Sequence, residues 1–150
     1  MADSVALERL PMTMGYFRLV LRGLGDTPEK RAGILEGTGV TEAELRDPKA
    51  EISLFQQLRQ TENLLRVCGP GWALIKPELW HHSAHGALGV AALNAPDLGV
   101  AAQVLDRYAH VRGPYQRAFM RMAGKTVTLG FRVAVPIEDR VWRPPSPDAA

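Results

Sequence analysis

The chain has 150 residues, a length typical of one domain, and its charged and hydrophobic fractions of 23% and 46% are ordinary for a globular protein. No run of about eighteen apolar residues is present, and the N-terminus lacks a basic start followed by an apolar stretch. The sequence therefore predicts neither a membrane span nor a signal peptide. The single cysteine, Cys68, excludes an internal disulfide and fits a reducing cytoplasm.

The net charge of +2 conceals an uneven distribution of charged side chains. Residues 1–106 hold 13 acidic and 10 basic side chains, whereas residues 107–150 hold 3 acidic and 8 basic ones. The basic third is either a solvated face or a surface that attracts an anionic ligand, a nucleic acid or an acidic partner.

The first half of the chain predicts helices that follow a flexible N-terminus at residues 1–14. The starts of all but the first helix carry a cap hydroxyl, followed by proline or, three residues later, by glutamate or glutamine. Glycine or Asp-Pro marks their ends. The expected helices cover residues 16–24, 28–36, 41–44 (one short turn) and 54–68.

The longest of these helices is expected to bury one apolar stripe. Its members share helical spacing: Leu54, Leu58, Thr61, Leu65 and Cys68. Beyond the Gly-Pro-Gly that ends this helix, Pro77 interrupts residues 72–80. We expect one short turn there, followed by an extended exit.

A proline break divides the next segment into two helices, residues 86–94 and 98–110. Three glycines occur where a side chain would hold the two helices apart: Gly86, Gly89 and Gly99. The segment contains no catalytic motif. A closely packed helical pair indicates recognition rather than chemistry.

After Arg112 the period of the apolar residues changes to two, which is typical of a half-buried strand. Two alternating stretches flank Ala123-Gly124 and predict an antiparallel hairpin at about 115–135. Its buried face is expected to include Val127, Leu129, Phe131, Val133 and Val135. The predicted fold class is α+β, with a mainly helical layer at about 16–112 followed by the hairpin. The proline-rich residues 137–150 predict a disordered tail.

The residues that could act in catalysis or bind a metal lack the neighbouring residues that such sites need. His81, His82 and His85 could ligate zinc or copper, but no fourth ligand follows at a recognised spacing. Cys68 could act as a nucleophile with His110 as its base, but it ends an apolar stripe and nothing beside it would activate it. We therefore predict no catalytic residue, no metal and no cofactor.

Small-molecule pockets are mostly apolar with a few polar anchors. Three residues are candidates for such ligand-binding anchors: His85, Tyr108 and Arg112. The helix at 98–110 has too few polar, base-reading side chains to be a DNA-recognition helix. The chain is therefore not expected to bind DNA by itself.

Several short motifs occur in an order that resembles one branch of the AraC-type transcriptional regulators. They are Ile34-Leu-Glu-Gly-Thr-Gly-Val40, Leu45-Arg-Asp-Pro48, the helix at 54–67, Ser83-Ala-His-Gly-Ala-Leu-Gly89, Asn94-Ala-Pro-Asp-Leu98 and Arg107-Tyr108. The resemblance is to the N-terminal arabinose-binding-like domain and runs from about residue 16 to residue 135. Where that branch usually has Ser-Pro-Thr-Leu, this chain has Ala-Pro-Asp-Leu, so Asp97 would cap the helix.

The resemblance implies a cytoplasmic regulator that senses a small-molecule effector, forms a homodimer and passes the signal to DNA. Residues 15–136 would be an incomplete ligand-sensing and dimerisation domain, and DNA would be bound only through a C-terminal helix-turn-helix domain absent from this chain. The chain could be trimmed, the product of a truncated gene or a stand-alone sensor. The alternative is an interaction module that forms mixed dimers with intact regulators, and an enzyme ranks third because no nucleophile, base and orienting group converge.

Overall fold

The computed structural model describes residues 11–133 except Pro114 and Lys125. The residues expected to form the tail at 137–150 lie outside this range, as does Val135. Among the described residues, no helix is both long and apolar enough to cross a membrane. The fold is α+β, with helices followed by an antiparallel hairpin, as the sequence predicts.

The chain divides into two compact units at the bond between Pro77 and Glu78. We call residues 11–77 the helical unit and residues 78–133 the hairpin unit. The sequence analysis treats residues 15–136 as one domain, whereas each unit of the structure forms contacts mainly within itself.

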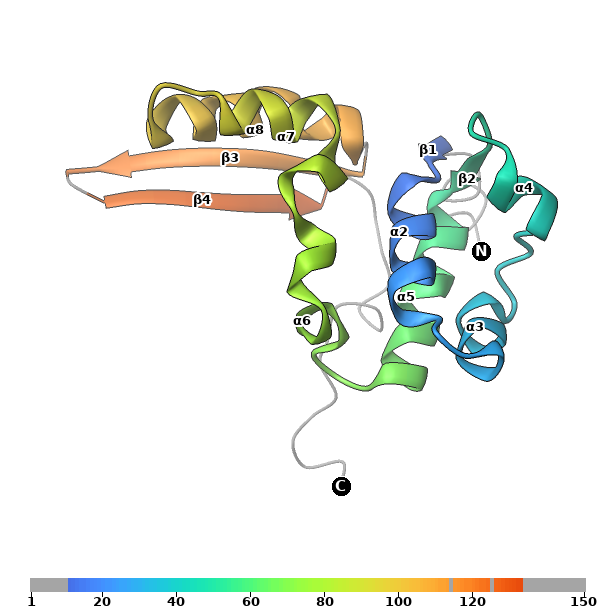
Figure 1. Ribbon diagram of the computed structural model, residues 1–150. Helices are drawn as coiled ribbons and strands as arrows, with labels where there is room; N and C mark the ends of the chain where they lie inside the picture. The colour runs from blue at the N-terminus through green and yellow to red at the C-terminus, as the bar shows by residue number, and fades with distance from the viewer. Residues whose placement is uncertain (1–10, 114, 125, 134–150) are drawn as a thin grey trace, which may run out of the picture. The chain divides into compact units, whose positions relative to one another are not determined.

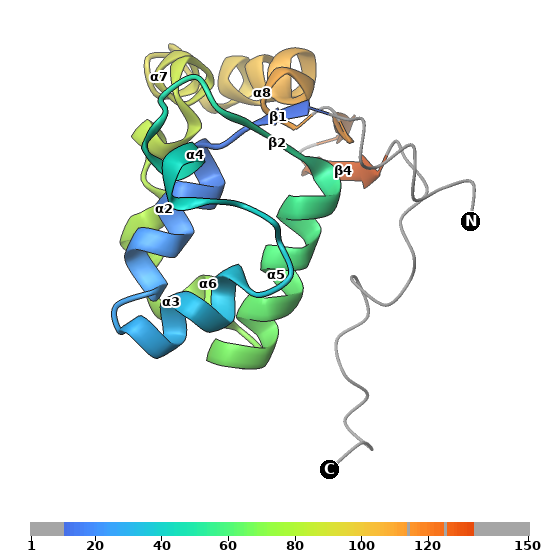
Figure 2. The same ribbon diagram turned by 90° about the vertical axis from the view of Figure 1, so that its right-hand side faces the viewer.

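The helical unit consists mainly of helices, with one pair of very short strands (Figures 1 and 2). In chain order its elements are β1 (Pro11–Thr13), α2 (Gly15–Leu24), α3 (Pro28–Leu35), α4 (Glu42–Arg46), β2 (Glu51–Ser53), α5 (Leu54–Cys68) and α6 (Trp72–Ile75). Helix α3 contacts both α2 and α5, and Figure 2 shows it between them at one end of the unit.

The helix starts predicted from cap residues are confirmed. The Thr27 hydroxyl accepts a hydrogen bond from the Lys30 backbone N–H at 3.2 Å. Thr41 with Glu44, and Ser53 with Gln56, form reciprocal capping boxes at the starts of α4 and α5. These side chains satisfy backbone donors that a helix leaves unpaired in its first turn.

Residues 11–14, which we expected to be flexible, are ordered parts of the fold. Strand β1 pairs antiparallel with β2, and Met12 lies opposite Ile52. Met12, Ile52 and Met14 are all buried. The expectation of flexibility is therefore wrong for these residues. A three-residue strand is too short to show a recognisable alternation, and its partner lies far along the chain.

The core of the helical unit is built from large side chains. Its buried apolar members are Met12, Met14, Phe17, Val20, Leu21, Leu24, Ile34, Ile52, Leu54 and Leu64. The predicted stripe of α5 is wrong in part, because Leu58, Thr61, Leu65 and Cys68 are only half-buried. The face turned to the core instead carries Gln60 and Asn63 beside Leu64.

Hydrogen bonds explain why two polar side chains of α5 are buried. Gln60 Nε2 donates to the carbonyl oxygen of Phe17 at 3.0 Å. Asn63 Nδ2 donates to the carbonyl oxygens of Ile34 at 3.0 Å and Glu36 at 2.7 Å. Since α3 ends at Leu35, Asn63 satisfies carbonyl groups that have no partner within that helix.

The hairpin unit contains short helices, a longer helix and two long strands. Its elements are η1 (Pro77–Trp80), which begins at the unit boundary, η2 (His82–His85), α7 (Ala87–Leu93), α8 (Leu98–Arg112), β3 (Gln116–Ala123) and β4 (Thr126–Val133). The short turn expected after Gly71 is helix α6, but the extended exit is wrong, because 3-10 turns follow it. Figure 1 shows α7 and α8 along the β3 side of the hairpin, and α8 packs against β3.

The two helices predicted around Pro96 adjoin each other, and the Asp97 side chain caps α8 by accepting from the Val100 N–H at 2.8 Å.

The role expected for the glycines near these two helices is wrong. A Cβ on Gly89 would collide with the carbonyl oxygen of His82 in η2, and one on Gly99 would meet only Asp97 Oδ1, at 3.1 Å. Gly86 has open space beside it and a positive φ of 60°. The atoms nearest to a Cβ on Gly89 therefore belong to η2, and a Cβ on Gly99 would meet no described atom of α7.

The predicted hairpin is confirmed in position and register, with Ala118 opposite Phe131 and Met120 opposite Leu129. The predicted burial of β4 is wrong, because Val127, Leu129 and Phe131 are all exposed. The side chain of Val133 lies outside the described set. Helix α8 packs against β3, and Ala118 on β3 is buried. The hairpin therefore buries one strand more than the other.

Candidate functional site

The three ligand anchors expected from the sequence lie on two elements of the hairpin unit. His85 ends η2 and is half-buried. Tyr108 lies on α8 and is 45% exposed, with the Arg107 guanidinium carbon 5.4 Å from the centre of its ring. Arg112 is the last residue of α8, and its side chain is outside the described set. A shared ligand site for these residues stays a prediction.

The other residues weighed for chemistry do not converge. The rings of His81 and His82 are 3.8 Å apart between centroids and tilted by 48°. Cys68 is a half-buried free thiol at the end of α5. Within the ranges described, no three histidine, cysteine or acidic side chains form a cluster suited to a metal ion.

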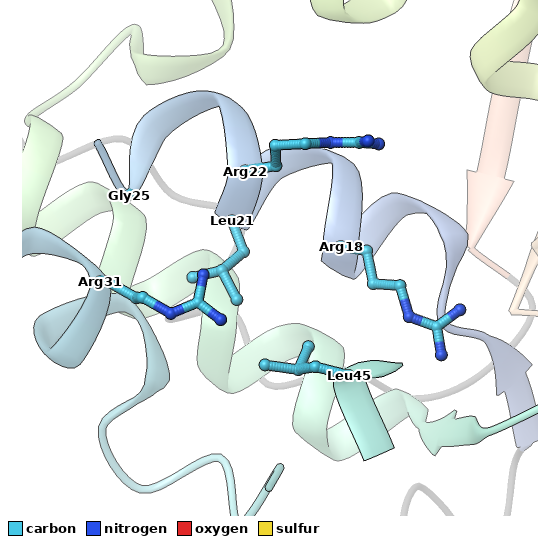
Figure 3. A pocket seen from close by; sticks show the side chains of 6 residues that line it. All are labelled: Arg18, Leu21, Arg22, Gly25, Arg31 and Leu45. Carbon is cyan, nitrogen blue, oxygen red and sulfur yellow. The ribbon is translucent and has the colours of Figure 1, made fainter. Parts of the chain in front are cut away.

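A cavity of about 420 Å³ lies in the helical unit, where α2, α3 and α4 meet (Figure 3). We call it the arginine cavity because three of its described lining residues are arginines. These lining residues are Arg18, Leu21, Arg22, Gly25, Arg31 and Leu45. In Figure 3 the two leucines lie between Arg31 on one side and Arg18 on the other. Its volume is in the range of sites that hold small organic ligands.

Two of these arginines are held in place by neighbouring groups. Arg18 Nη2 donates to the carbonyl oxygens of Glu44, at 3.0 Å, and Asp47 at the end of α4. Arg31 donates from Nε, at 3.1 Å, and Nη2, at 2.8 Å, to Glu42 Oε1. Arg18 therefore binds carbonyl groups at the negative end of α4, and Arg31 links α3 to α4.

Arg22 differs from the other two arginines. It is exposed and makes no hydrogen bond or ion pair with the residues that the structure describes. Two carboxylates of α4 are already engaged: Glu42 pairs with Arg31, which lines the cavity, and Glu44 accepts from the Thr41 hydroxyl at 2.7 Å. The cavity therefore carries more positive than negative charge.

The apolar side of the cavity comes from Leu21, which is buried, and Leu45, which is half-buried. Gly25 allows α3 to lie close to the end of α2. A Cβ at this position would be 2.6 Å from the Leu21 carbonyl oxygen and 3.3 Å from the Arg31 Cα. The close approach that Gly25 permits brings Arg31 to the cavity.

A second cavity of the helical unit, about 240 Å³, has charged groups that are already paired. Asp26 and Lys30 form an ion pair at 3.0 Å, and Lys76 Nζ donates to the Gly23 carbonyl oxygen at 2.7 Å. The hydrogen bond from Lys30 holds the pKa of Asp26 below its usual value. Cys68 also lines this cavity. Its charged groups serve the fold and leave little for a ligand.

Part of the basic third gathers on one face of the hairpin. Arg121 and Arg132 place their guanidinium carbons 5.6 Å and 6.0 Å from the centre of the Phe119 ring, and Arg117 lies opposite Arg132 in the register. The Phe119 ring covers Gly130, where a Cβ would collide with it. An aromatic ring attracts a cation that lies over its face. The Phe119 ring therefore offsets some of the repulsion between these guanidinium charges.

The arginine cavity was missed by sequence reasoning. Arg18 and Arg22 are four residues apart, so they lie on the same side of α2, and like charges at this spacing are destabilising. The spacing of two arginines alone is only weak evidence for a binding site. Arg31 and Leu45 join the cavity from two other helices, and no local pattern connects them to α2.

The comparisons with known proteins give one family and no close relative. The family described as the arabinose-binding domain of AraC transcription regulator, N-terminal, matches residues 30–146, which is most of the chain and includes parts of both units. No curated protein matches this chain. The match agrees with the resemblance found in the sequence motifs. The chain therefore belongs to the family of N-terminal arabinose-binding domains of AraC transcription regulators, and it is a ligand-sensing regulatory domain.

Proposed function

We propose that this chain senses a small-molecule effector in the cytoplasm and associates with a second copy of itself, without catalysing a reaction. In this proposal DNA is bound by a helix-turn-helix domain outside residues 1–150. The observation that carries it is the family match over residues 30–146, because the family is the regulatory domain of transcription regulators. The match does not identify the effector of this chain, because arabinose is part of the family's name.

Self-association is supported by the surface of the hairpin unit. Eight large apolar or aromatic side chains are exposed there: Val90, Leu93, Leu98, Tyr108, Val111, Val127, Leu129 and Phe131. Of these, Val127, Leu129 and Phe131 alternate along β4 and so lie on one face of the strand, and contiguous exposed apolar surface marks interaction sites in soluble proteins. A second copy would bring an equivalent surface, as two-fold homodimers do.

The proposed mechanism is a population shift. An effector that binds one arrangement of the domain more tightly than another increases the population of that arrangement, and the attached DNA-binding domain is presented differently. His85, Tyr108 and Arg112 remain proposed effector contacts in the hairpin unit. The close helix contact that we first attributed to glycines is not part of this mechanism.

Light scattering over a range of protein concentrations tests self-association. We expect a dimer that the double variant Leu129→Ser/Phe131→Ser weakens, because both side chains are exposed on β4. The matched control is Leu74→Ser/Ile75→Ser, which changes two exposed side chains of α6 in the helical unit and should leave the dimer intact. A monomer at every concentration, or equal effects of the two variants, would contradict this part of the proposal.

Thermal unfolding in the presence of a metabolite panel tests sensing. We expect at least one compound to raise the midpoint, because a ligand that binds only the folded state stabilises it. If no compound changes the midpoint, the sensing role is wrong.

A further inference from the structure

The arginine cavity combines unused positive charge with an apolar wall. Arg18 and Arg31 are fixed by neighbouring oxygens, whereas Arg22 makes no hydrogen bond or ion pair with a described residue. The Nε of Arg18 is also buried without a hydrogen-bond partner, so this guanidinium is not saturated. The carboxylate of Glu42 pairs with Arg31, so within the described residues the charges of Arg18 and Arg22 have no carboxylate partner.

An anionic ligand fits this charge distribution better than a neutral one. Arginine has only donors, arranged as a planar fork that matches a carboxylate or phosphate. A neutral sugar needs acceptors as well as donors for its hydroxyl groups. Among the described lining residues, no side chain carries an acceptor oxygen and none is aromatic. The cavity therefore selects against a neutral sugar.

The leucines define the rest of the ligand. Leu21 and Leu45 lie between the guanidinium groups of Arg31 and Arg18 in Figure 3. Leu21 is already buried, so the half-buried Leu45 supplies the apolar surface. A free phosphate would leave this surface in contact with water, whereas a hydrocarbon chain or ring would cover it. The cavity volume of about 420 Å³ leaves room for such a body.

We propose that the arginine cavity binds a small organic carboxylate with an apolar body. The carboxylate pairs with Arg22 and the apolar body covers Leu45, beside the buried Leu21. Binding itself is independent of the proposed sensing function, and only the step in which the bound acid acts as the effector rests on it.

Calorimetric titration of the full chain with hexanoate, benzoate, inorganic phosphate and L-arabinose tests the proposal. We expect saturable binding of the two organic acids that is tighter than binding of phosphate or arabinose. Arg22→Gln should weaken it by about tenfold or more, since a charge-assisted pair is lost. Arg22 has no described partner, so its replacement should not disturb the fold.

The matched control is Arg46→Gln, which removes the same charge from an exposed position of the helical unit that does not line the cavity. Binding should be unchanged in this variant. The proposal is overturned if neither acid binds, if Arg46→Gln and Arg22→Gln act equally, or if phosphate or arabinose binds as tightly as the acids.

A third variant separates this proposal from the proposed function. Tyr108→Ala removes an expected anchor in the hairpin unit. If a metabolite binds, only Tyr108→Ala abolishes its binding and neither acid binds, sensing stands and the arginine cavity is wrong. If the acids bind through Arg22 but leave dimerisation of the chain and DNA binding by the intact regulator unchanged, the cavity stands and the acid is not the effector.

Discussion

The two units of this chain bury different kinds of side chain. Among the side chains that the structure describes, the ten buried apolar residues of the helical unit include Phe17, Ile34 and Leu64, whereas those of the hairpin unit are three alanines, Ala102, Ala109 and Ala118. Larger side chains contribute more to stability when they are buried. Within the described residues, the helical unit therefore has a core of large side chains, whereas the hairpin unit fully buries none of its large apolar side chains and leaves eight large apolar or aromatic ones exposed.

This difference indicates separate roles for the two units. The helical unit has polar side chains that tie its elements together, such as Gln60 and Asn63, and a cavity with unused charge. The hairpin unit has a two-stranded sheet, which is marginally stable unless something packs against it. Helix α8 packs against β3, and the exposed apolar side chains of β4 are available to a partner.

The same substitution in each unit should give very different losses of stability. Leu64→Ala removes a fully buried side chain of α5 and should lower the free energy of unfolding by about 2–5 kcal/mol. Leu98→Ala changes a side chain of α8 that is 84% exposed, and its effect should stay within about 0.5 kcal/mol. Chemical denaturation at low protein concentration measures both. Equal losses would contradict the contrast between the two units.

The stability of the hairpin unit should fall more when a side chain is enlarged than when one is shortened. Gly89→Ala places a methyl group against the His82 carbonyl oxygen, so η2 or α7 must shift, at a cost of roughly 1–3 kcal/mol. Gly99→Ala is the matched control, because its Cβ would meet only the side chain of Asp97. Hydrogen exchange resolved by segment should show faster exchange in η2 and α7 for Gly89→Ala only. Equal effects of the two substitutions would contradict the assignment of the crowded contact to Gly89 alone.

What could be predicted from the sequence depended on short-range interactions. The caps by Thr27, Thr41, Ser53 and Asp97 each join residues three apart, so the helix starts were recognisable from local pattern. The hairpin was recognisable because its two strands are adjacent in the chain. In these cases the partner lies within the same stretch of sequence.

The predictions that failed depended on partners far along the chain. Gln60 is buried because it bonds to Phe17, 43 residues away, and Asn63 because it bonds to Ile34, 29 residues away. Polar residues at helical spacing are normally expected on the solvent face. The arginine cavity needs three helices, and the exposure of β4 depends on which strand α8 covers. Periodicity shows that a strand has an apolar face without showing what covers it.

The smallest expected effect concerns the acid stability of the helical unit. Hydrogen bonds from the Thr41 hydroxyl and then from its backbone N–H lower the pKa of Glu44 below its usual value of 4.5. A carboxyl with a lowered folded-state pKa contributes stability above its unfolded pKa and loses that contribution as the pH falls through the folded value. Helix α4 should therefore loosen below about pH 4.5.

Glu44→Gln tests this contribution, because glutamine can still accept the capping-box hydrogen bonds but does not titrate. Stability at neutral pH should change little, and the loss on acidification should be smaller than in the unchanged chain. Hydrogen exchange of α4, measured from about pH 7 down to about pH 3 with correction for the intrinsic exchange rate, gives the comparison. Identical acid profiles of the two chains would mean that protonation of Glu44 does not destabilise the helical unit. The arginine cavity, which α4 lines, would then keep its geometry in acid.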